Sequence, residues 1–224
     1  IPYRRGDILD RNGTYLATTQ KVYNLILDPQ QILLNEENYL EPSVSALASV
    51  FGYDPSTIRN LIRENPSKQY IRYERQLSYE QKEAFENLKE ETNKKNAAQN
   101  SKDRIRGVWF EEEYKRIYPY DSLGASVIGF VNGDGMDGAI GIERSYNDDL
   151  VGINGREYGY LNDDSNLERV IKSAANGNTV MSTIDLKIQD VVEKNIRQWQ
   201  NETGSKHIGV VVMNPNNGEV LAMA

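Results

Sequence analysis

The chain has 224 residues, of which 38% are hydrophobic and 26% charged, so a packed core can form beneath a well-solvated surface. Its net charge of −7 and pI near 5.0 argue against a nucleic-acid partner, whose binding surface would be basic. Cysteine is absent and histidine occurs once, which excludes disulfides, thiolate metal sites and sites of several histidines. We expect neither a metal nor a cofactor.

The chain as written contains no run that approaches the ~18 apolar residues of a membrane-spanning helix. No signal peptide precedes Ile1, and the last residues stop inside a strand-like run, so both ends look cut. Two apolar strand-like segments within residues 206–224 carry unpaired edges, which predicts pairing with another chain.

The N-terminal part predicts three short strands. Residues 6–9 and 15–19 flank a turn at 10–13, whose Asn-Gly pair is typical of a type I′ hairpin. Alternating apolar and polar residues predict the third strand over 22–27.

Residues 30–105 predict a helical insertion. Apolar residues at helical spacing end at Gly52, and Asp54 is placed to cap a second helix. A capping box at 78–81 opens a third helix, and the polar stretch 93–103 predicts a mobile loop.

The stretch from Arg116 to Gly155 is the one around which the second half is organised. A strand ends at Pro119, because proline fixes φ and lacks an N–H. Four glycines then interrupt the chain before helical spacing resumes over 142–150. Glu143 falls in the first turn of that helix, where a carboxylate suits the helix dipole and can pair with an arginine. Arg5 and Arg116 are the candidate partners.

The C-terminal part predicts a strand over 156–161, a polar turn over 162–166, and a hairpin from residues 170–171 to 179–183. Asp185 then caps a helix, and two strands follow over 207–213 and 219–224. An apolar stripe on that helix is predicted to face the core; its members are Ile188, Val191, Val192, Ile196 and Trp199.

Several short motifs are better explained as turns or strand ends. The spacing of Gly133, Gly135 and Gly138 matches a dinucleotide fingerprint, but Asp134 and Asp137 would repel a pyrophosphate. The same aspartate at 137 occupies the position at which a calcium loop needs glycine, so a dedicated calcium site is not expected. An Arg-Gly-Asp tripeptide at 5–7 is too short to indicate a function.

Three blocks of residues resemble class B penicillin-binding proteins. The first is Arg5-Gly6-Asp7-Ile8-Leu9-Asp10-Arg11-Asn12-Gly13 followed by Leu16-Ala17. The second is Arg116-x-Tyr118-Pro119 with Gly138-x-x-Gly141-x-Glu143, continuing through Tyr146-Asn147-x-x-Leu150-x-Gly152-x-x-Gly155. The third is Thr183-Ile184-Asp185 with Ile188-Gln189, then the strands of residues 209–224. One departure is Asp121, where the family usually has glycine.

The resemblance implies an α+β pedestal with a mixed or antiparallel sheet over residues 1–179, including the helical insertion at 30–105. Residues 180–224 would be the first helix and hairpin of a transpeptidase domain. The parent enzyme would cross-link peptidoglycan through a serine acyl-enzyme and be the target of β-lactams. It would lie at the extracytoplasmic face of the bacterial membrane, held by an N-terminal anchor outside this sequence. A second copy or a membrane glycosyltransferase would be its partner.

Catalytic residues of that class are absent from the sequence. No Ser-x-x-Lys and no Lys-[Ser/Thr]-Gly occurs, and Ser145-x-Asn147 matches the remaining element by letters alone. We therefore expect a non-catalytic pedestal. The alternative is a free-standing extracellular interaction module with no enzymatic parent.

The residues expected to form a structural or interaction motif are Arg5, Gly6, Asp10, Arg11, Gly13, Arg116, Tyr118, Pro119, Gly141, Glu143, Gly152 and Gly155. Their charged members are expected to form one ion-pair network that fixes how the strands cross. The alternative for these residues is a partner-binding face.

Overall fold

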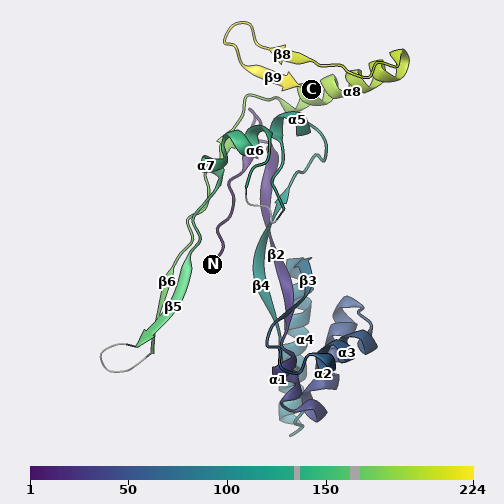
Figure 1. Cartoon of the computed structure of the whole chain (residues 1–224), viewed down its shortest axis with the longest axis vertical. Helices are drawn as coiled ribbons and strands as arrows, with labels where there is room; N and C mark the ends of the chain where they lie inside the picture. Colours follow the sequence, from purple (N-terminus) through teal and green to yellow (C-terminus); the bar gives the residue numbers. More distant parts are fainter. Residues whose placement is uncertain (134–136, 162–166) are drawn as a thin grey trace. The chain divides into compact units, whose positions relative to one another are not determined.

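The computed structural model describes residues 1–133, 137–161 and 167–224 (Figure 1). Asp134, Gly135 and the predicted turn at 162–166 lie outside these ranges. The chain divides into two compact units, the first comprising residues 1–20 and 114–224 and the second residues 21–113. Strands β2 (Tyr15–Leu27) and β4 (Val108–Ile117) contribute residues to both units. The fold is α+β with a mixed sheet, as the sequence predicts.

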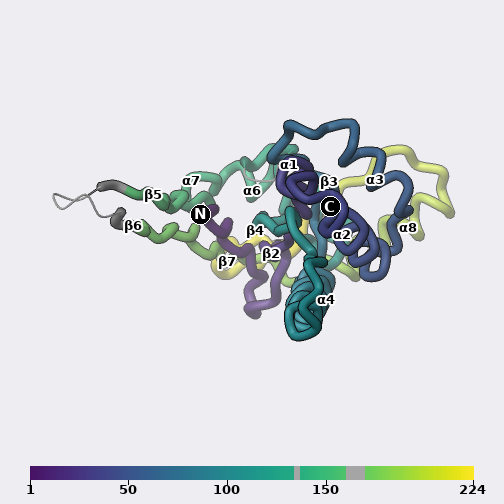
Figure 2. Tube along the Cα trace, turned by 90° about the horizontal axis from the view of Figure 1, so that it is seen from below, coloured from purple at the N-terminus to yellow at the C-terminus, as the bar shows by residue number. Residues whose placement is uncertain are grey.

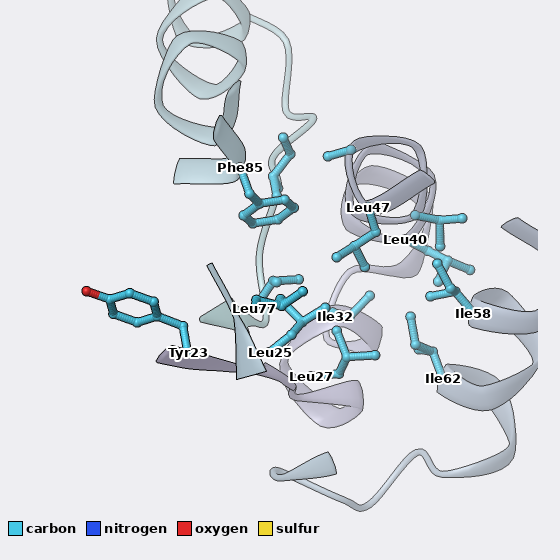
Figure 3. Close-up of a cluster of buried hydrophobic side chains, with 14 residues drawn as sticks. Tyr23, Leu25, Leu27, Ile32, Leu40, Leu47, Ile58, Ile62, Leu77 and Phe85 are labelled. Atoms are coloured by element: carbon cyan, nitrogen blue, oxygen red, sulfur yellow. The ribbon is translucent and has the colours of Figure 1, made fainter. Parts of the chain in front are cut away.

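The second unit is a helical insertion on a small sheet. Strand β3 (Ile71–Leu77) is antiparallel to β2, and β4 also pairs with β2. Four helices pack with these strands: α1 (Pro29–Leu33), α2 (Glu36–Phe51), α3 (Pro55–Glu64) and α4 (Tyr79–Ala98). Figure 3 shows their apolar side chains converging, with Leu25, Leu47 and Phe85 fully buried.

Local capping signals set the ends of these helices. Gly52 ends α2 with a left-handed φ of 72°, and the Asp54 carboxylate accepts a hydrogen bond from the Thr57 N–H at the start of α3. Ser78 and Gln81 form both hydrogen bonds of a capping box at the start of α4. These three predictions are confirmed.

The mobile loop predicted over 93–103 is wrong for its first half, because α4 continues to Ala98. The Asn93 side chain accepts a hydrogen bond from the Ile105 N–H and donates one to the Ile105 carbonyl. A polar side chain in this stretch therefore binds the backbone of Ile105, after the end of α4. The polarity of the sequence alone does not predict this contact.

In the first unit, the central strand is β1 (Ile8–Leu9). It pairs antiparallel with β2 and parallel with β7 (Val180–Met181). A small core forms around it from Ile8, Leu16, Ala17, Ile128, Leu150 and Ile184. Three short helices follow β4: α5 (Ala125–Ile128), α6 (Gly141–Ser145) and α7 (Asn147–Leu150).

The remaining elements of this unit are two hairpins and one long helix. Strands β5 (Arg156–Leu161) and β6 (Leu167–Lys172) pair antiparallel and run side by side in Figures 1 and 2. Helix α8 (Leu186–Thr203) is followed by the antiparallel pair β8 (Val211–Met213) and β9 (Val220–Met223). None of the helices in the part of the chain that the structure describes has the length and hydrophobicity of a membrane-spanning segment.

Two strand predictions need correction. The hairpin predicted from 170 to 183 does not form, because β6 pairs with β5 while β7 pairs with β1. The strands predicted over 15–19 and 22–27 are one continuous strand, β2.

The turn between β1 and β2 is also not type I′, which requires positive φ at both central residues. The Gly13 N–H donates to the Asp10 carbonyl, and Gly13 has a φ of 82°. Asn12 is not among the described residues of positive φ, so Gly13 follows the two central residues of the turn instead of being one of them.

The apolar stripe predicted to face the core on α8 is only partly buried. Val191 is 56% exposed and Trp199 58%, Ile188, Val192 and Ile196 are half-buried, and the buried side chain of this helix is Gln189. The periodicity identifies the helix correctly, but none of these five side chains belongs to the core of the first unit as the structure describes it.

Replacement of Phe85 by alanine tests the core of the second unit. Phe85 is fully buried and stacks with Phe51, so its loss should lower the free energy of unfolding of this unit by ~3–5 kcal/mol. The measurement is urea denaturation in a Trp199→Phe background, where Trp109 reports on residues 21–113. Leu34→Ala is the control, because Leu34 is 78% exposed. A loss no larger than that of the control would contradict the packing.

Candidate functional site

The most buried charged cluster of the first unit is built on Glu143. This residue lies in the first turn of α6 and is fully buried. The short helix begins at Gly141, which has a φ of 64° and lies against the backbone of residues 127–129. A carboxylate placed this far from water needs cationic partners.

Arg5 is the first of these partners, and its side chain is fully buried. Its Nε and Nη2 atoms each lie 2.9 Å from Glu143 Oε2, and Nη2 also donates to the Glu143 carbonyl. The Nη1 atom donates to Asn147 Oδ1 at 2.9 Å. The guanidinium of Arg5 thus binds both the side chain and the backbone of the α6–α7 segment.

Arg116, at the end of β4, is the second partner. Its Nε donates to Glu143 Oε1 at 2.7 Å, and Nη1 donates to the Gly6 carbonyl and to Thr19 Oγ1. The ion pairs that the sequence predicts between Glu143 and Arg5 or Arg116 are therefore both present.

Tyr118 completes the coordination of the carboxylate by donating its hydroxyl to Glu143 Oε1 at 3.2 Å. Burial, followed by the nearby Glu143 charge, raises the pKa of Tyr118 to about 12. The phenol therefore stays protonated and remains a donor near neutral pH. We call Arg5, Arg116, Tyr118 and Glu143 the carboxylate cluster.

Backbone proximity explains two of the motif glycines. A Cβ added to Gly6 would lie 1.8 Å from the Asn178 carbonyl oxygen, and the Gly6 N–H donates to the Leu150 carbonyl. A Cβ on Gly141 would lie 2.5 Å from the Val127 carbonyl oxygen. A side chain at Gly6 would push the N-terminal segment away from residues 177–178, and one at Gly141 would push the start of α6 away from residues 127–129.

The expected single network of charges is wrong, since Asp10 and Arg11 bind elsewhere. Asp10 Oδ1 accepts hydrogen bonds from the backbone of Asn12 and Thr14, and Oδ2 accepts one from Leu186 at the start of α8. Arg11 lies 3.3 Å from Glu219. The motif therefore forms two charged sites, one on either side of β1.

The environment of Asp10 has opposing effects on its pKa. Burial raises the pKa, but hydrogen bonds from Thr14, Asn12 and Leu186 outweigh burial, and the pKa is lowered from its usual 3.8. Asp10 is accordingly charged near neutral pH.

The other motif residues lie at turns and backbone contacts. Pro119 is the second residue after β4, which ends at Ile117. Gly152 lies against the backbone of Ala175, and the Gly155 N–H donates to the Ile1 carbonyl. Asp121 has a left-handed φ of 51°, the conformation that favours the glycine usual at this position of the family.

Sequence reasoning missed three polar residues of this region. Asn147 connects the carboxylate cluster to the Gly138 N–H, and Arg4 donates to Asp7 at 2.7 Å and to the Thr19 carbonyl. Asn147 stands in the quoted family block, which is the signal that could have identified it.

The cluster is suited to holding chain segments together and not to catalysis. Its two guanidinium groups donate hydrogen bonds and accept none, and both oxygens of their carboxylate are engaged. Among the described residues, no group of three histidine, cysteine, aspartate or glutamate side chains could hold a metal ion.

Residues 1–182 match the family described as the penicillin-binding protein dimerisation domain. The chain belongs to this family. The resemblance given by the three sequence blocks is confirmed.

Named relatives extend this assignment. The chain is 30% identical to the probable peptidoglycan D,D-transpeptidase PbpC of Pseudomonas aeruginosa, covering 100% of this chain and 36% of the relative. It is 28% identical to stage V sporulation protein D of Bacillus subtilis, covering 98% and 32%. The chain therefore spans about a third of the length of these relatives.

Solved structures share the fold. Penicillin-binding protein 2X of Streptococcus thermophilus superposes with a TM-score of 0.75 at 23% identity, covering 100% of this chain and 34% of that one. The complex between penicillin-binding protein PBP2 and MreC of Helicobacter pylori gives a TM-score of 0.61 at 21% identity, covering 100% and 42%.

Glu143→Gln tests how much the carboxylate cluster contributes to the free energy of unfolding. The substitution leaves two buried guanidinium groups without a counter-ion, which should lower the free energy of unfolding of the first unit by ~3–5 kcal/mol. The measurement is urea denaturation in a Trp109→Phe background, followed by Trp199. Asp190→Asn, in the surface pair with Lys194 on α8 of the same unit, should change stability by less than ~1 kcal/mol. Equal effects of the two substitutions would contradict the assignment.

Asp10→Asn tests the lowered pKa. Because the native pKa lies below the unfolded value, the charge stabilises the fold above pH 3.8, and this contribution is lost as the pH falls through the native pKa. The variant should thus be less stable than the parent at neutral pH, and the difference should shrink on acidification. Chemical denaturation at several pH values measures this difference. A difference that stays constant or grows would be inconsistent with the carboxylate's role.

Proposed function

We propose that this chain is the non-catalytic pedestal of a peptidoglycan D,D-transpeptidase, which holds the catalytic domain above the membrane. The observation that carries the proposal is the carboxylate cluster, which joins the N-terminal segment, the end of β4 and the α6–α7 segment without a reactive group. The transpeptidase names of relatives that span the whole chain support the same role.

The division of the chain follows from this proposal. Residues 1–179 would be the pedestal, with the helical insertion at 30–105, and residues 180–224 would begin the transpeptidase domain. The exposed apolar face of α8 supports this division, because it borders a hollow of about 630 Å³ lined by Val191, Ile196, Trp199, Ile208 and Val210 among others. A further domain packed there would cover these side chains.

The parent protein would be a serine-type enzyme whose nucleophile lies outside these residues. The sequence supports a catalytic site outside these residues, since no Ser-x-x-Lys or Lys-[Ser/Thr]-Gly occurs among them. The parent would act at the extracytoplasmic face of the membrane, reached through an anchor outside this sequence.

We further assign the motif residues Arg5, Arg116 and Glu143 to holding the pedestal together instead of forming a partner-binding face. Their side chains are at most 2% exposed, so a partner could not contact them without unfolding. Partner surfaces would lie on other residues of the pedestal. The family's description as a dimerisation domain supports a second copy, and the PBP2–MreC complex shows that a relative of this fold is seen with a partner.

A free-standing extracellular module without an enzymatic parent is not favoured. Transpeptidase relatives of about three times this length align with the whole chain, which that alternative does not explain.

A fluorescent penicillin tests the non-catalytic assignment. The purified chain should show no covalent label after denaturing electrophoresis, because it lacks the serine and lysine that form the acyl-enzyme. A class B penicillin-binding protein that carries its catalytic domain is the positive control. Stoichiometric labelling that survives boiling in detergent would overturn the assignment.

A further inference from the structure

The turn between β1 and β2 is hydrogen-bonded to the start of helix α8. The Arg11 N–H donates to the Ile184 carbonyl at 2.9 Å, two residues before α8 begins. Asp10 Oδ2 accepts the Leu186 N–H at 3.3 Å, which is the first N–H of that helix. Asp10 therefore caps α8 from a distant part of the sequence.

The next two side chains of the turn also contact this segment. Asn12 Nδ2 donates to Asp185 Oδ2 at 3.3 Å, while Asp185 Oδ1 caps Lys187 and Ile188 within the helix. Arg11 pairs with Glu219, just before β9. Three consecutive side chains thus bind the helix start and the hairpin that follows.

Helix α8 and strand β9 are joined to each other by separate contacts. The Asp185 N–H donates to the Leu221 carbonyl, and the buried Gln189 amide exchanges two hydrogen bonds with the Met223 backbone, each 2.9 Å long. A change in the direction of α8 would therefore carry β9 with it.

The opposite end of the same N-terminal segment is fixed by the carboxylate cluster. Arg5 binds Glu143, the Gly6 carbonyl accepts from Arg116, and Ile8 and Leu9 pair with β2 on one side and β7 on the other. Between the cluster and the turn lie only four residues, of which Ile8 is fully buried. The turn is consequently held at a defined place relative to the cluster.

We propose that Asp10, Arg11 and Asn12 are positioning residues that set the direction of α8 and of the β8–β9 hairpin relative to β1. The inference deepens the proposed function, on which it rests for the identity of α8 as the start of the catalytic domain. In that setting the turn determines how the catalytic domain is oriented on its pedestal.

Contacts outside the turn also restrain α8: Ile184 and Leu186 pack in the core of the first unit, and the eighth residue of the helix makes a further hydrogen bond. Glu193 Oε1 accepts the Gly124 N–H of the segment before α5 at 2.7 Å. With this contact intact, loss of the Asp10 hydrogen bond would let the helix change direction without leaving the body of the unit. The expected effect is therefore a wider range of orientations, not detachment.

Asp10→Asn separates positioning from turn formation. Asparagine keeps one oxygen to accept the Asn12 and Thr14 N–H groups, but its NH₂ group faces the Leu186 N–H. The experiment measures the distance between spin labels at Ser145→Cys and Asn195→Cys, both exposed, in a chain that has no native cysteine. The parent should give one narrow distance, and Asp10→Asn should lose it in favour of a broad distribution.

Hydrogen exchange provides a second measurement on the same variant. Exchange at the Leu186 amide should become faster by roughly tenfold or more, because its charged acceptor has been removed. Amides in the middle of α8 should keep the parent rate, which distinguishes a change at the helix start from unfolding of the helix.

Asp190→Asn is the matched control, since Asp190 pairs with Lys194 on the surface of the same helix. A distance distribution in Asp10→Asn that matches this control would overturn the proposal. If Asp10→Asn does not fold, Arg11→Ala takes its place, and an unchanged distribution in that folded variant would overturn it equally. Neither readout involves penicillin, so failure here leaves the labelling test of the pedestal unaffected.

Discussion

One buried carboxylate, Glu143, makes it possible for two arginine side chains to lie inside the first unit. Its partners are 138 and 27 positions away in the sequence, so the ion pairs close long loops as well as neutralising charge. Two guanidinium groups and one carboxylate leave a single excess positive charge. Hydrogen bonds to the Gly6 carbonyl, Thr19 and Asn147 occupy further donors, whereas Arg116 Nη2 is buried with no hydrogen-bond partner among the described residues. Loss of any one member would leave a buried charge without its partner and destabilise the fold. The cluster therefore fixes three segments only when all of its members are present.

The position of this cluster explains why glycine surrounds it. Gly6 and Gly141 lie where backbones approach too closely for a Cβ; Gly6 is next to Arg5, and Gly141 lies two residues before Glu143. Side-chain pairing and backbone contact therefore depend on each other. The same N-terminal segment continues through β1 to the turn that binds α8, so a single strand connects the cluster to the proposed start of the catalytic domain.

Helix-capping signals, which act over a few residues, are predictable from this sequence. The caps at Asp54, Ser78 and Asp185 depend on neighbouring N–H groups, and the structure has all three. The pairing of Glu143 with the arginines was accessible because a carboxylate in a first turn needs a counter-ion and because the three family blocks contain few charges.

Strand pairs and ion pairs between distant parts of the chain cannot be predicted from local sequence patterns in the same way. Strand β7 pairs with β1 and not with β6, although nothing in the local pattern of residues 167–183 distinguishes the two. Asp10 and Arg11 share a sequence block with Arg5 but face α8 and Glu219, because β1 separates the two sites. The apolar stripe of α8 shows that periodicity identifies a helix without identifying what packs on it.

Arg5 and Glu143 stabilise the fold through each other. This coupling can be measured with a double-mutant cycle of Arg5→Met and Glu143→Leu, followed by urea denaturation of the first unit. We expect the double variant to be more stable than the sum of the single losses predicts, by roughly 2–3 kcal/mol. Additivity to within about 0.5 kcal/mol would show that the two residues act independently and would contradict the account.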